Sequence, residues 1–478
     1  MPSLLTLPLE LLVAISTYLS TKDLGFLRLT CKRVEKSLYS WFAEEFFTKK
    51  QFMLTHKSLQ TLIDISRHES LSKHVTHVIL ATNIYPAVLY TFRDADAAAS
   101  WTQGFYDQQA LMSTGYDQDM LTEAFEKLDN LQVVGIRDFN SNNRRRDGTN
   151  ASWSSWGAPT VLQETGIELQ FASDRFSNTT TSFLAHIFQT LICALARAGR
   201  KPPNIEVFLR KELLPDIAFH FPSFLTPSVT PILQNLETLL ISTDRIPTHA
   251  LRHGIGADGK DGPFLRQFLG QTHNLRHLRI NFNKFARLHT DSFLEWLGQP
   301  AVATGAAPIR ILDPPPIALT NLEQLELGQM TVGPVCLLRV IDKFASTLKD
   351  FCLWRTNLVN HPDDARSAAK STITADFLKS LSCMRQLVLT HFKLGFLQQD
   401  GHFTNFKTQD LKDAPCDKTR EYTGEKMGHF IQELINDIVI DEPRSYYSDH
   451  SDDGSNDDDN EDLEMLDEEG GDSENDDE

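Results

Sequence analysis

The chain has 478 residues, 41% of them hydrophobic and 23% charged, which is enough for about three domains of ordinary size. Its six cysteines are scattered without a Cys-x-x-Cys pair, and no run approaches the roughly 18 uncharged apolar residues that a membrane span needs. The net charge is −18, but residues 448–478 hold 17 acidic residues and no Lys or Arg, so the remainder is nearly neutral and lacks the basic face of a nucleic-acid binder.

The first fifty residues predict three short helices. Pro8 suits a first helical turn, and Glu10 lies near the positive end of that helix dipole. Apolar residues follow at helical spacing, at Leu11, Leu12, Ile15 and Leu19. Asp23 is expected to cap a second helix. A third helix has an apolar stripe at Val34, Leu38, Phe42 and Phe46. Three such helices barely make a core, so large apolar side chains are left over for a partner or for the following domain.

This stretch resembles the F-box, a three-helix module. The positions that carry the resemblance are Leu7, Pro8, Glu10, Leu11, Leu12, Ile15, Leu19, Asp23, Leu24, Leu29, Cys31, Lys32 and Arg33. One departure is Val34, where the family often has Trp. The resemblance implies docking on the Skp-type adaptor of a cullin–RING ubiquitin ligase, with the rest of the chain choosing the substrate. We expect Leu7, Pro8, Leu11, Leu12 and Ile15 to form the adaptor-binding surface or the small core that presents it.

The N-terminus does not read as a signal peptide. No basic region precedes its apolar run, and Pro8 and Glu10 interrupt that run. With no secretory signal, the scattered cysteines are expected to be reduced, in the cytosol or the nucleus.

An apolar-x-x-apolar-x-apolar unit repeats along the middle of the chain. Its copies are Val75/Val78/Leu80, Leu131/Val134/Ile136, Leu236/Leu239/Ile241, Leu275/Leu278/Ile280, Leu322/Leu325/Leu327, Leu348/Phe351/Leu353 and Met384/Leu387/Leu389, with weaker copies beginning at Ile167 and Ile205. Asn precedes the first apolar residue in four copies, at Asn130, Asn235, Asn274 and Asn321. The unit resembles the strand segment of a leucine-rich repeat, but the spacing is longer than in the regular family. The alternative is a set of ordinary strands in an α/β domain.

Helical patterns lie between the copies, at Phe183–Ala198, Phe264–Leu269, Phe293–Leu297, Val335–Phe344 and Phe377–Leu381. A strand and its return helix cannot bury their apolar faces alone, so stacked neighbours would share one core. We therefore predict an α/β fold. An F-box over residues 1–50 precedes an irregular leucine-rich-repeat-like strand–helix solenoid with inserted loops over 51–440, and 441–478 form a disordered acidic tail.

Polar segments rich in Gly and Pro predict loops at 141–159, 253–263, 298–316 and 360–370. The first contains Arg144–Arg146, which we expect to be exposed. Gly254–Lys260 has phosphate-loop spacing, but Asp261 stands where Ser or Thr is required, so nucleotide binding is not expected. The pairs His249/His253 and His273/His277 lack an evident third metal ligand. No cofactor or metal is predicted.

The acidic tail has too little apolar surface to fold. Ser455 and Ser473 each precede an acidic residue by three positions, a weak pattern for phosphorylation. The tail is expected to be solvated, or to contact basic proteins.

By resemblance, the chain is expected to be the substrate-recognition subunit of a Skp–cullin–F-box ubiquitin ligase, without an active site of its own. It would contact the adaptor, and through it cullin, and an unknown protein client. The residues beside the last apolar position of each copy point away from the core, which predicts a client surface at Arg137, Arg279, Asn281, Glu326, Trp354 and Thr390. The alternatives are a non-degradative F-box scaffold and an enzyme concealed in the repeat region.

Overall fold

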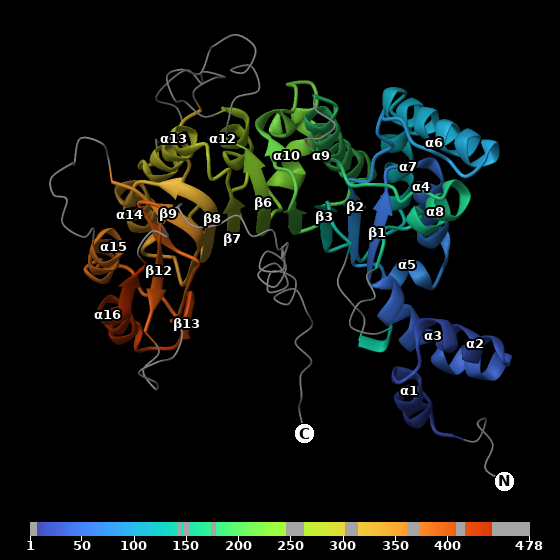
Figure 1. Ribbon diagram of the computed structural model, residues 1–478, viewed down its shortest axis with the longest axis horizontal. Coiled ribbons are helices and arrows are strands. Elements are labelled where there is room, and N and C mark those ends of the chain that lie inside the picture. The colour runs from blue at the N-terminus through green and yellow to red at the C-terminus, as the bar shows by residue number, and fades with distance from the viewer. Residues whose placement is uncertain are drawn as a thin grey trace, which may run out of the picture. The chain divides into compact units, whose positions relative to one another are not determined.

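Figure 1 shows the computed structural model of the chain, which describes residues 7–140, 145–147, 153–173, 178–244, 262–301, 314–360, 372–407 and 416–441. The acidic tail with Ser455 and Ser473 lies outside these residues, as do Gly254–Lys260 and most of the predicted loops. The chain divides into two compact units. One contains the residues up to Glu45 and the segment Asn140–Ser155, and the other contains Phe46–Phe139 and Trp156–Glu442. No helix of the described residues has the length and apolar character to cross a membrane.

The three predicted helices are α1 (Leu9–Thr17), α2 (Thr21–Leu29) and α3 (Lys32–Phe47). The first unit contains them up to Glu45, near the end of α3, together with a short 3₁₀ helix, η2 (Arg145–Asp147). Asp23 was expected to cap α2, but the cap is Ser20. The Ser20 hydroxyl oxygen accepts the Asp23 backbone N–H at 3.1 Å, and the same hydroxyl donates to the Asp23 carboxylate at 2.7 Å. The residue that caps a helix must lie just before its first turn, where its side chain reaches an unpaired N–H.

The core of the three helices is small. Leu12, Leu24, Val34 and Leu38 are buried, and Arg28 covers the ring of Phe42 with its guanidinium 3.4 Å from the ring centroid. The apolar stripe predicted for the third helix is therefore confirmed. A core of this size buries only part of the apolar side chains that the three helices carry.

The second unit is built on one 14-stranded sheet of the described residues, with the predicted α/β character confirmed. The parallel strands are β1 (Lys49–Met53), β2 (His77–Ala81), β3 (Val133–Arg137), β4 (Asn204–Phe208), β6 (Thr238–Asp244), β7 (His277–Asn281), β8 (Gln324–Val332), β9 (Asp350–Leu358) and β10 (His391–Gly395), joined by the short β5 (Leu214–Pro215) and β11 (Gln398–Gln399). From β1 to β9 the strands of the main path follow chain order, and each pairs with the next in parallel. This order is typical of a solenoid, in which each strand–helix segment stacks on the one before it.

Helices connect the strands and lie along one side of the sheet (Figure 1). They are α4 (His56–Arg67), α5 (Leu71–His74), α6 (Ala95–Ser113), α7 (Tyr116–Phe125), α8 (Ala158–Thr165), α9 (Asn178–Ala198), η4 (Asp216–Phe219), α10 (Thr226–Leu233), α12 (Phe264–Leu269), α13 (Arg287–Gly298), α14 (Pro334–Phe344), α15 (Ile373–Ser382) and α16 (Met427–Asp437). All five predicted helical segments fall within α9, α12, α13, α14 and α15. The others, including the long α6, have no counterpart in the sequence prediction.

The core of the sheet consists of two rows of apolar side chains in register. One row is Val78, Val134, Ile205, Leu239, Leu278, Leu325, Phe351 and Phe392, and the other is Leu80, Ile136, Val207, Ile241, Ile280, Leu327, Leu353 and Leu394. All of these side chains are buried. Side chains alternate along a strand, so the two apolar positions of each copy lie on the same face, toward the helices.

The repeated asparagines connect neighbouring copies. The side-chain amides of Asn130, Asn235 and Asn274 each donate a hydrogen bond at 2.7 Å, to the carbonyl oxygens of Lys73, Lys201 and Gln234 respectively. Each acceptor lies before the preceding strand of the sheet. In these three copies the Asn of the sequence unit is therefore explained by a bond between copies rather than within one.

Three sequence assignments need correction. His391 pairs with Asp350, so the last copy is Leu389, Phe392 and Leu394, and the unit that begins at Met384 is out of register by five residues. The weak copy at Ile205 is a strand, but Ile205 occupies the second apolar position. The segment that begins at Ile167 contributes no strand to the sheet.

The sequence prediction also missed the two ends of the sheet. The first strand, β1, has the charged Lys50 at a core position, where its ammonium lies 5.1 Å from the Phe47 ring. The other end contains β12 (His402–Phe406), β13 (Thr419–Thr423) and β14 (Ile438–Ile440). There β13 pairs antiparallel with β10, and β14 pairs antiparallel with β12. The added strands β13 and β14 provide partners for β10 and β12, whose backbone groups would otherwise form open edges.

Candidate docking surfaces

The first candidate surface consists of apolar side chains that α1 and α2 leave exposed. They are Leu9, Leu11, Ile15, Tyr18, Phe26 and Leu29, and we call them the helical docking surface. Tyr18 and Leu29 are the most exposed, at 89% and 83%. Six large apolar residues in a stretch of about twenty residues far exceed the isolated exposed apolar residue that is normal for a protein surface, which makes them a candidate contact site for a partner.

The predicted adaptor-binding residues divide between this surface and the core. Leu11, Ile15 and Pro8 are exposed, Leu7 is half-buried, and Leu12 is buried. Leu12 therefore belongs to the small core that presents the surface. The sequence prediction did not include Leu9, Tyr18, Phe26 or Leu29 in the site. Helical spacing could have identified them, because they are apolar residues away from the face that α1 and α2 bury.

The second candidate surface is the face of the sheet opposite the helices, where the first, third and fifth residues of each strand project. Of the predicted client residues, Arg279 and Glu326 lie on neighbouring strands and are in contact. Asn281 and Trp354 lie in one row with Gly328 between them. Arg137 lies further along the sheet, on β3.

Thr390 does not lie on this face. The corrected register places it before β10, at the position that Lys349 occupies before β9, and the residues that flank Leu394 are Lys393 and Gly395. Lys393 was therefore missed because the copy was read in the wrong register. The signal that could have found it is the second apolar-x-x-apolar-x-apolar match, Leu389/Phe392/Leu394.

Ion pairs between strands occupy much of the open face. Glu326 accepts from Arg279 Nε at 2.6 Å and contacts His277 Nε2 at 2.5 Å. Burial would raise the pKa of Glu326, but the His277 hydrogen bond and the Arg279 charge outweigh it, and the pKa is lowered. Glu326 is therefore ionised at neutral pH and compensates Arg279, which is itself buried.

Histidines begin two other strands of this face in different charge environments. Burial, together with the charges of Lys49 and Arg137, lowers the pKa of His77 well below its usual value, so His77 is neutral. Burial also disfavours the charged form of His391, but hydrogen bonds with Asp350 and Glu421 outweigh this and raise its pKa. The ring nitrogens of His391 lie 2.7 Å and 2.9 Å from these two carboxylates.

An aromatic and cationic cluster lies at the end of the open face, and we call it the Trp354 patch. It comprises Trp354, Phe396, Lys393, Arg355 and Lys418. The Phe396 ring meets Trp354 edge-on with centroids 5.1 Å apart, and the Lys393 ammonium lies 5.9 Å from the Trp354 ring. Arg355 and Lys418 lie 5.8 Å and 5.6 Å from the Phe396 ring. Trp and Arg are enriched among the residues that contribute most to binding energy at protein interfaces, which makes this patch a candidate contact site.

Two glycines and a backbone bend give the Trp354 patch its shape. A Cβ atom on Gly395 would lie 2.0 Å from the Trp354 ring, so the indole lies against bare backbone. The backbone bends directly after Gly328, Trp354 and Gly395. The next residue in each case, Gln329, Arg355 and Phe396 respectively, has a positive φ angle of 46–53°. This conformation is unfavourable for residues other than glycine, and it occurs at matching positions of three neighbouring strands.

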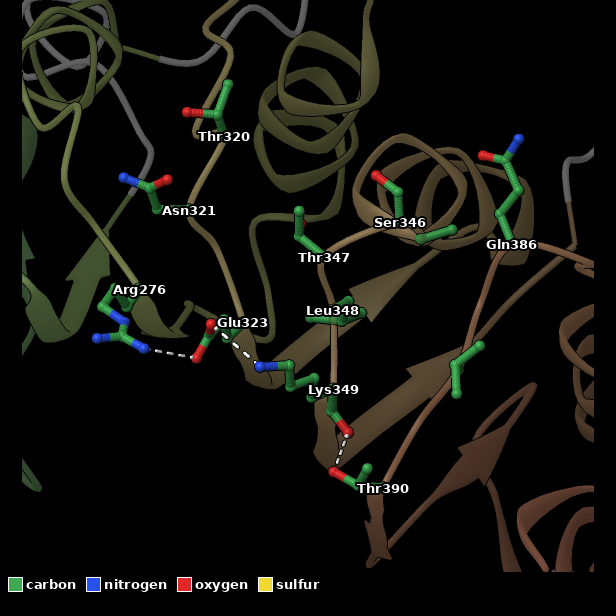
Figure 2. A pocket seen from close by; sticks show the side chains of 12 residues that line it. Arg276, Thr320, Asn321, Glu323, Ser346, Thr347, Leu348, Lys349, Gln386 and Thr390 are labelled. Atoms are coloured by element: carbon green, nitrogen blue, oxygen red, sulfur yellow. Dashed lines mark hydrogen bonds and ion pairs between the residues drawn. The ribbon is translucent and has the colours of Figure 1, made fainter. Parts of the chain in front are cut away.

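A pocket of about 660 Å³ lies at the amino-terminal ends of the strands, along the turns that precede β7–β10 (Figure 2). Glu323 bridges Arg276 and Lys349 there at 3.0 Å and 3.2 Å, and the Thr390 hydroxyl donates to the Lys349 carbonyl oxygen. Hydrogen bonds from these two cations lower the pKa of Glu323. Exposed ion pairs of this kind are weak in water.

The described residues contain no group of three potential metal ligands, and His277 pairs with Glu326 instead.

Comparison with protein families identifies the domain that contains α1 and α2. Residues 4–37 match the model of the F-box domain. The chain carries an F-box domain. An F-box domain implies that the chain binds a Skp-type adaptor. Through that adaptor the chain would belong to a cullin-based ubiquitin ligase complex. No curated protein matches the chain.

Proposed function

We propose that this F-box protein is the substrate-recognition subunit of a Skp–cullin–F-box ubiquitin ligase in the cytosol or the nucleus. The observation that carries the proposal is the F-box domain at residues 4–37, whose α1 and α2 expose the helical docking surface. In this proposal the chain supplies proximity between a client and the ubiquitin-loaded enzyme, and its partners supply the chemistry.

The proposed client surface is the open face of the sheet, centred on the Trp354 patch. Trp354 is half-buried, and it extends from β9, which pairs with β8 on one side and with β10 on the other. Arg279 and Glu326 contribute differently from Trp354. Because they neutralise each other, we propose that they shape the face rather than form charged contacts with a client.

A pull-down with the full chain tests the ligase proposal. The F-box protein should capture the Skp-type adaptor together with cullin, and loss of the chain should lengthen the half-life of a captured client. The alternative, a non-degradative F-box scaffold, captures the adaptor without changing the half-life of any client. Failure to capture the adaptor would contradict both.

A tryptophan substitution tests the client surface. Trp354→Ala should abolish client capture and leave adaptor binding intact, because Trp354 lies in the sheet unit. Trp156→Ala is the matched control, since Trp156 is also partly exposed but lies beside β1 rather than β9. Equal client capture by wild type and Trp354→Ala would move recognition to the inserted loops.

A further inference from the structure

The short helix η2 belongs to the unit of the F-box helices, although about a hundred residues separate it from α3 in sequence. The sequence predicted an exposed loop here, with Arg144–Arg146 in water. Arg146 instead has a side chain only 6% exposed. A guanidinium is buried at low cost only when its N–H groups have hydrogen-bond acceptors.

Arg146 compensates a missing cation at the end of α1. The last turn of α1 contains no basic residue, although its final carbonyl groups carry the negative end of the helix dipole. The backbone gives two of these carbonyls only the short-range bonds from Tyr18 N–H to Ile15 and from Leu19 N–H to Ser16. Arg146 Nη1 donates to the carbonyl oxygen of Ser16 at 3.0 Å and to that of Leu19 at 3.1 Å. A residue from a distant segment therefore supplies the C-terminal charge that α1 lacks.

The same guanidinium reaches α3. Arg146 Nη2 lies 2.8 Å from the Glu45 carboxylate, and the guanidinium carbon lies 5.4 Å from the centroid of the Trp41 ring. Arg146 thus connects the end of α1 with the second half of α3 through charge-assisted hydrogen bonds, which are stronger than neutral ones.

Asp147 performs the complementary task at the start of α2. Its carboxylate accepts the Thr21 backbone N–H at 2.7 Å and also accepts the Thr21 hydroxyl. Thr21 is the first residue of α2, where a negative charge is favoured by the helix dipole and by unpaired N–H groups. Two consecutive residues of opposite charge therefore stabilise the facing ends of two consecutive helices.

We infer that Arg146 and Asp147 are positioning residues for the helical docking surface. They fix the turn between α1 and α2, and these two helices, with the C-cap residue Tyr18 of α1, carry all six side chains of that surface. The apolar core of the three helices is small, so the polar ties decide more of the α1–α2 geometry than they would in a larger domain. The F-box of this chain is thus completed by a segment inserted far along the sequence. The inference rests on the proposed function for its binding partner, but not for its geometry.

Substitutions in the full chain test this inference, with a purified Skp-type adaptor as the probe. Arg146→Met retains the stem beside Trp41 and removes the donors, and Asp147→Ala removes the carboxylate. The double variant should bind the adaptor at least tenfold more weakly, while the melting transition of the sheet unit stays unchanged. Arg146→Lys retains the charge and should recover part of the lost affinity. Arg67→Met, which removes an exposed ion pair with Glu123 in the sheet unit, is the matched control and should bind like wild type.

Hydrogen exchange gives a second measurement that does not need a partner. The Thr21 amide should exchange at least tenfold faster in Asp147→Ala than in wild type, because its acceptor is lost. Wild-type affinity in the double variant would overturn the positioning role, and an unchanged Thr21 exchange rate would overturn the contact itself. If wild type does not bind the adaptor, the proposed function fails, and the exchange rate alone decides whether these residues hold α1 and α2.

Discussion

Leu11 and Leu12 are neighbours in α1 with opposite environments. Leu11 is half exposed and Leu12 is buried in the small core. A truncation at each position therefore separates binding from folding.

Leu11→Ala combined with Ile15→Ala should weaken adaptor binding by about tenfold or more, equivalent to about 1.4 kcal/mol, with little change in stability. Leu12→Ala should instead destabilise the F-box helices by about 2 kcal/mol or more, because it opens a cavity. Calorimetric titration with the adaptor and thermal melting measure the two effects. Leu162→Ala, an exposed leucine on α8, is the control for both.

His391 makes the stability of the last parallel strand dependent on pH. Its pKa is raised in the folded chain by Asp350 and Glu421, against the opposing effect of burial. A raised histidine pKa contributes stability that is complete below the unfolded value of about 6.5 and is lost as the pH rises through the folded value. The gap in melting temperature between wild type and His391→Asn should therefore be largest near pH 6 and shrink toward pH 9. His429→Asn, which changes an exposed histidine on α16, is the control and should give a small gap throughout. A gap that grows with pH would contradict this assignment.

At the scale of elements, the asparagines that join neighbouring copies contribute to stacking. Asn235→Ala removes a bond to the Lys201 carbonyl, and we expect a loss of about 1 kcal/mol in the free energy of unfolding. Asn321→Ala is the matched control, because Asn321 has the same place in its copy and is exposed like Asn235, but its amide makes no hydrogen bond to the preceding copy within the described residues and lines the pocket of Figure 2 instead. Chemical denaturation of both variants measures the difference. Equal losses would show that the bond between copies adds nothing.

At the scale of the whole molecule, the acidic tail accounts for nearly all of the net charge. Removing residues 448–478 changes the net charge from −18 to about −1. We expect a nearly unchanged melting temperature, since the segment has almost no apolar surface to bury, and lower solubility near neutral pH, since repulsion between molecules is lost. Thermal melting and light scattering of the truncated chain check both expectations. A fall of many degrees would show that the tail packs on the body.

Local spacing was sufficient for features that depend on the period of a single helix or strand. The stripe at Val34, Leu38 and Phe46 and the strand pattern at Leu278 and Ile280 are buried as predicted, because helical and strand periods determine which side chains share a face. The F-box was identified in the same way, from a contiguous stretch of residues.

Tertiary structure decided what depends on partners far apart in sequence. The register of β10 is determined by β9, which is why Thr390 and the copy beginning at Met384 were misplaced. Arg279 was predicted as a contact for a client, and its burial beside Glu326 depends on a residue 47 positions away. Arg146 looked like an exposed loop residue because its acceptors, the carbonyls of Ser16 and Leu19, lie about 130 positions earlier. Periodicity is a property of local backbone geometry, so the sequence by itself determined the F-box helices, the repeated strands from β2 to β9 and the five return helices that were predicted with them. Charge compensation depends on the groups that the fold brings together, so only the tertiary structure decided which polar side chains remain available.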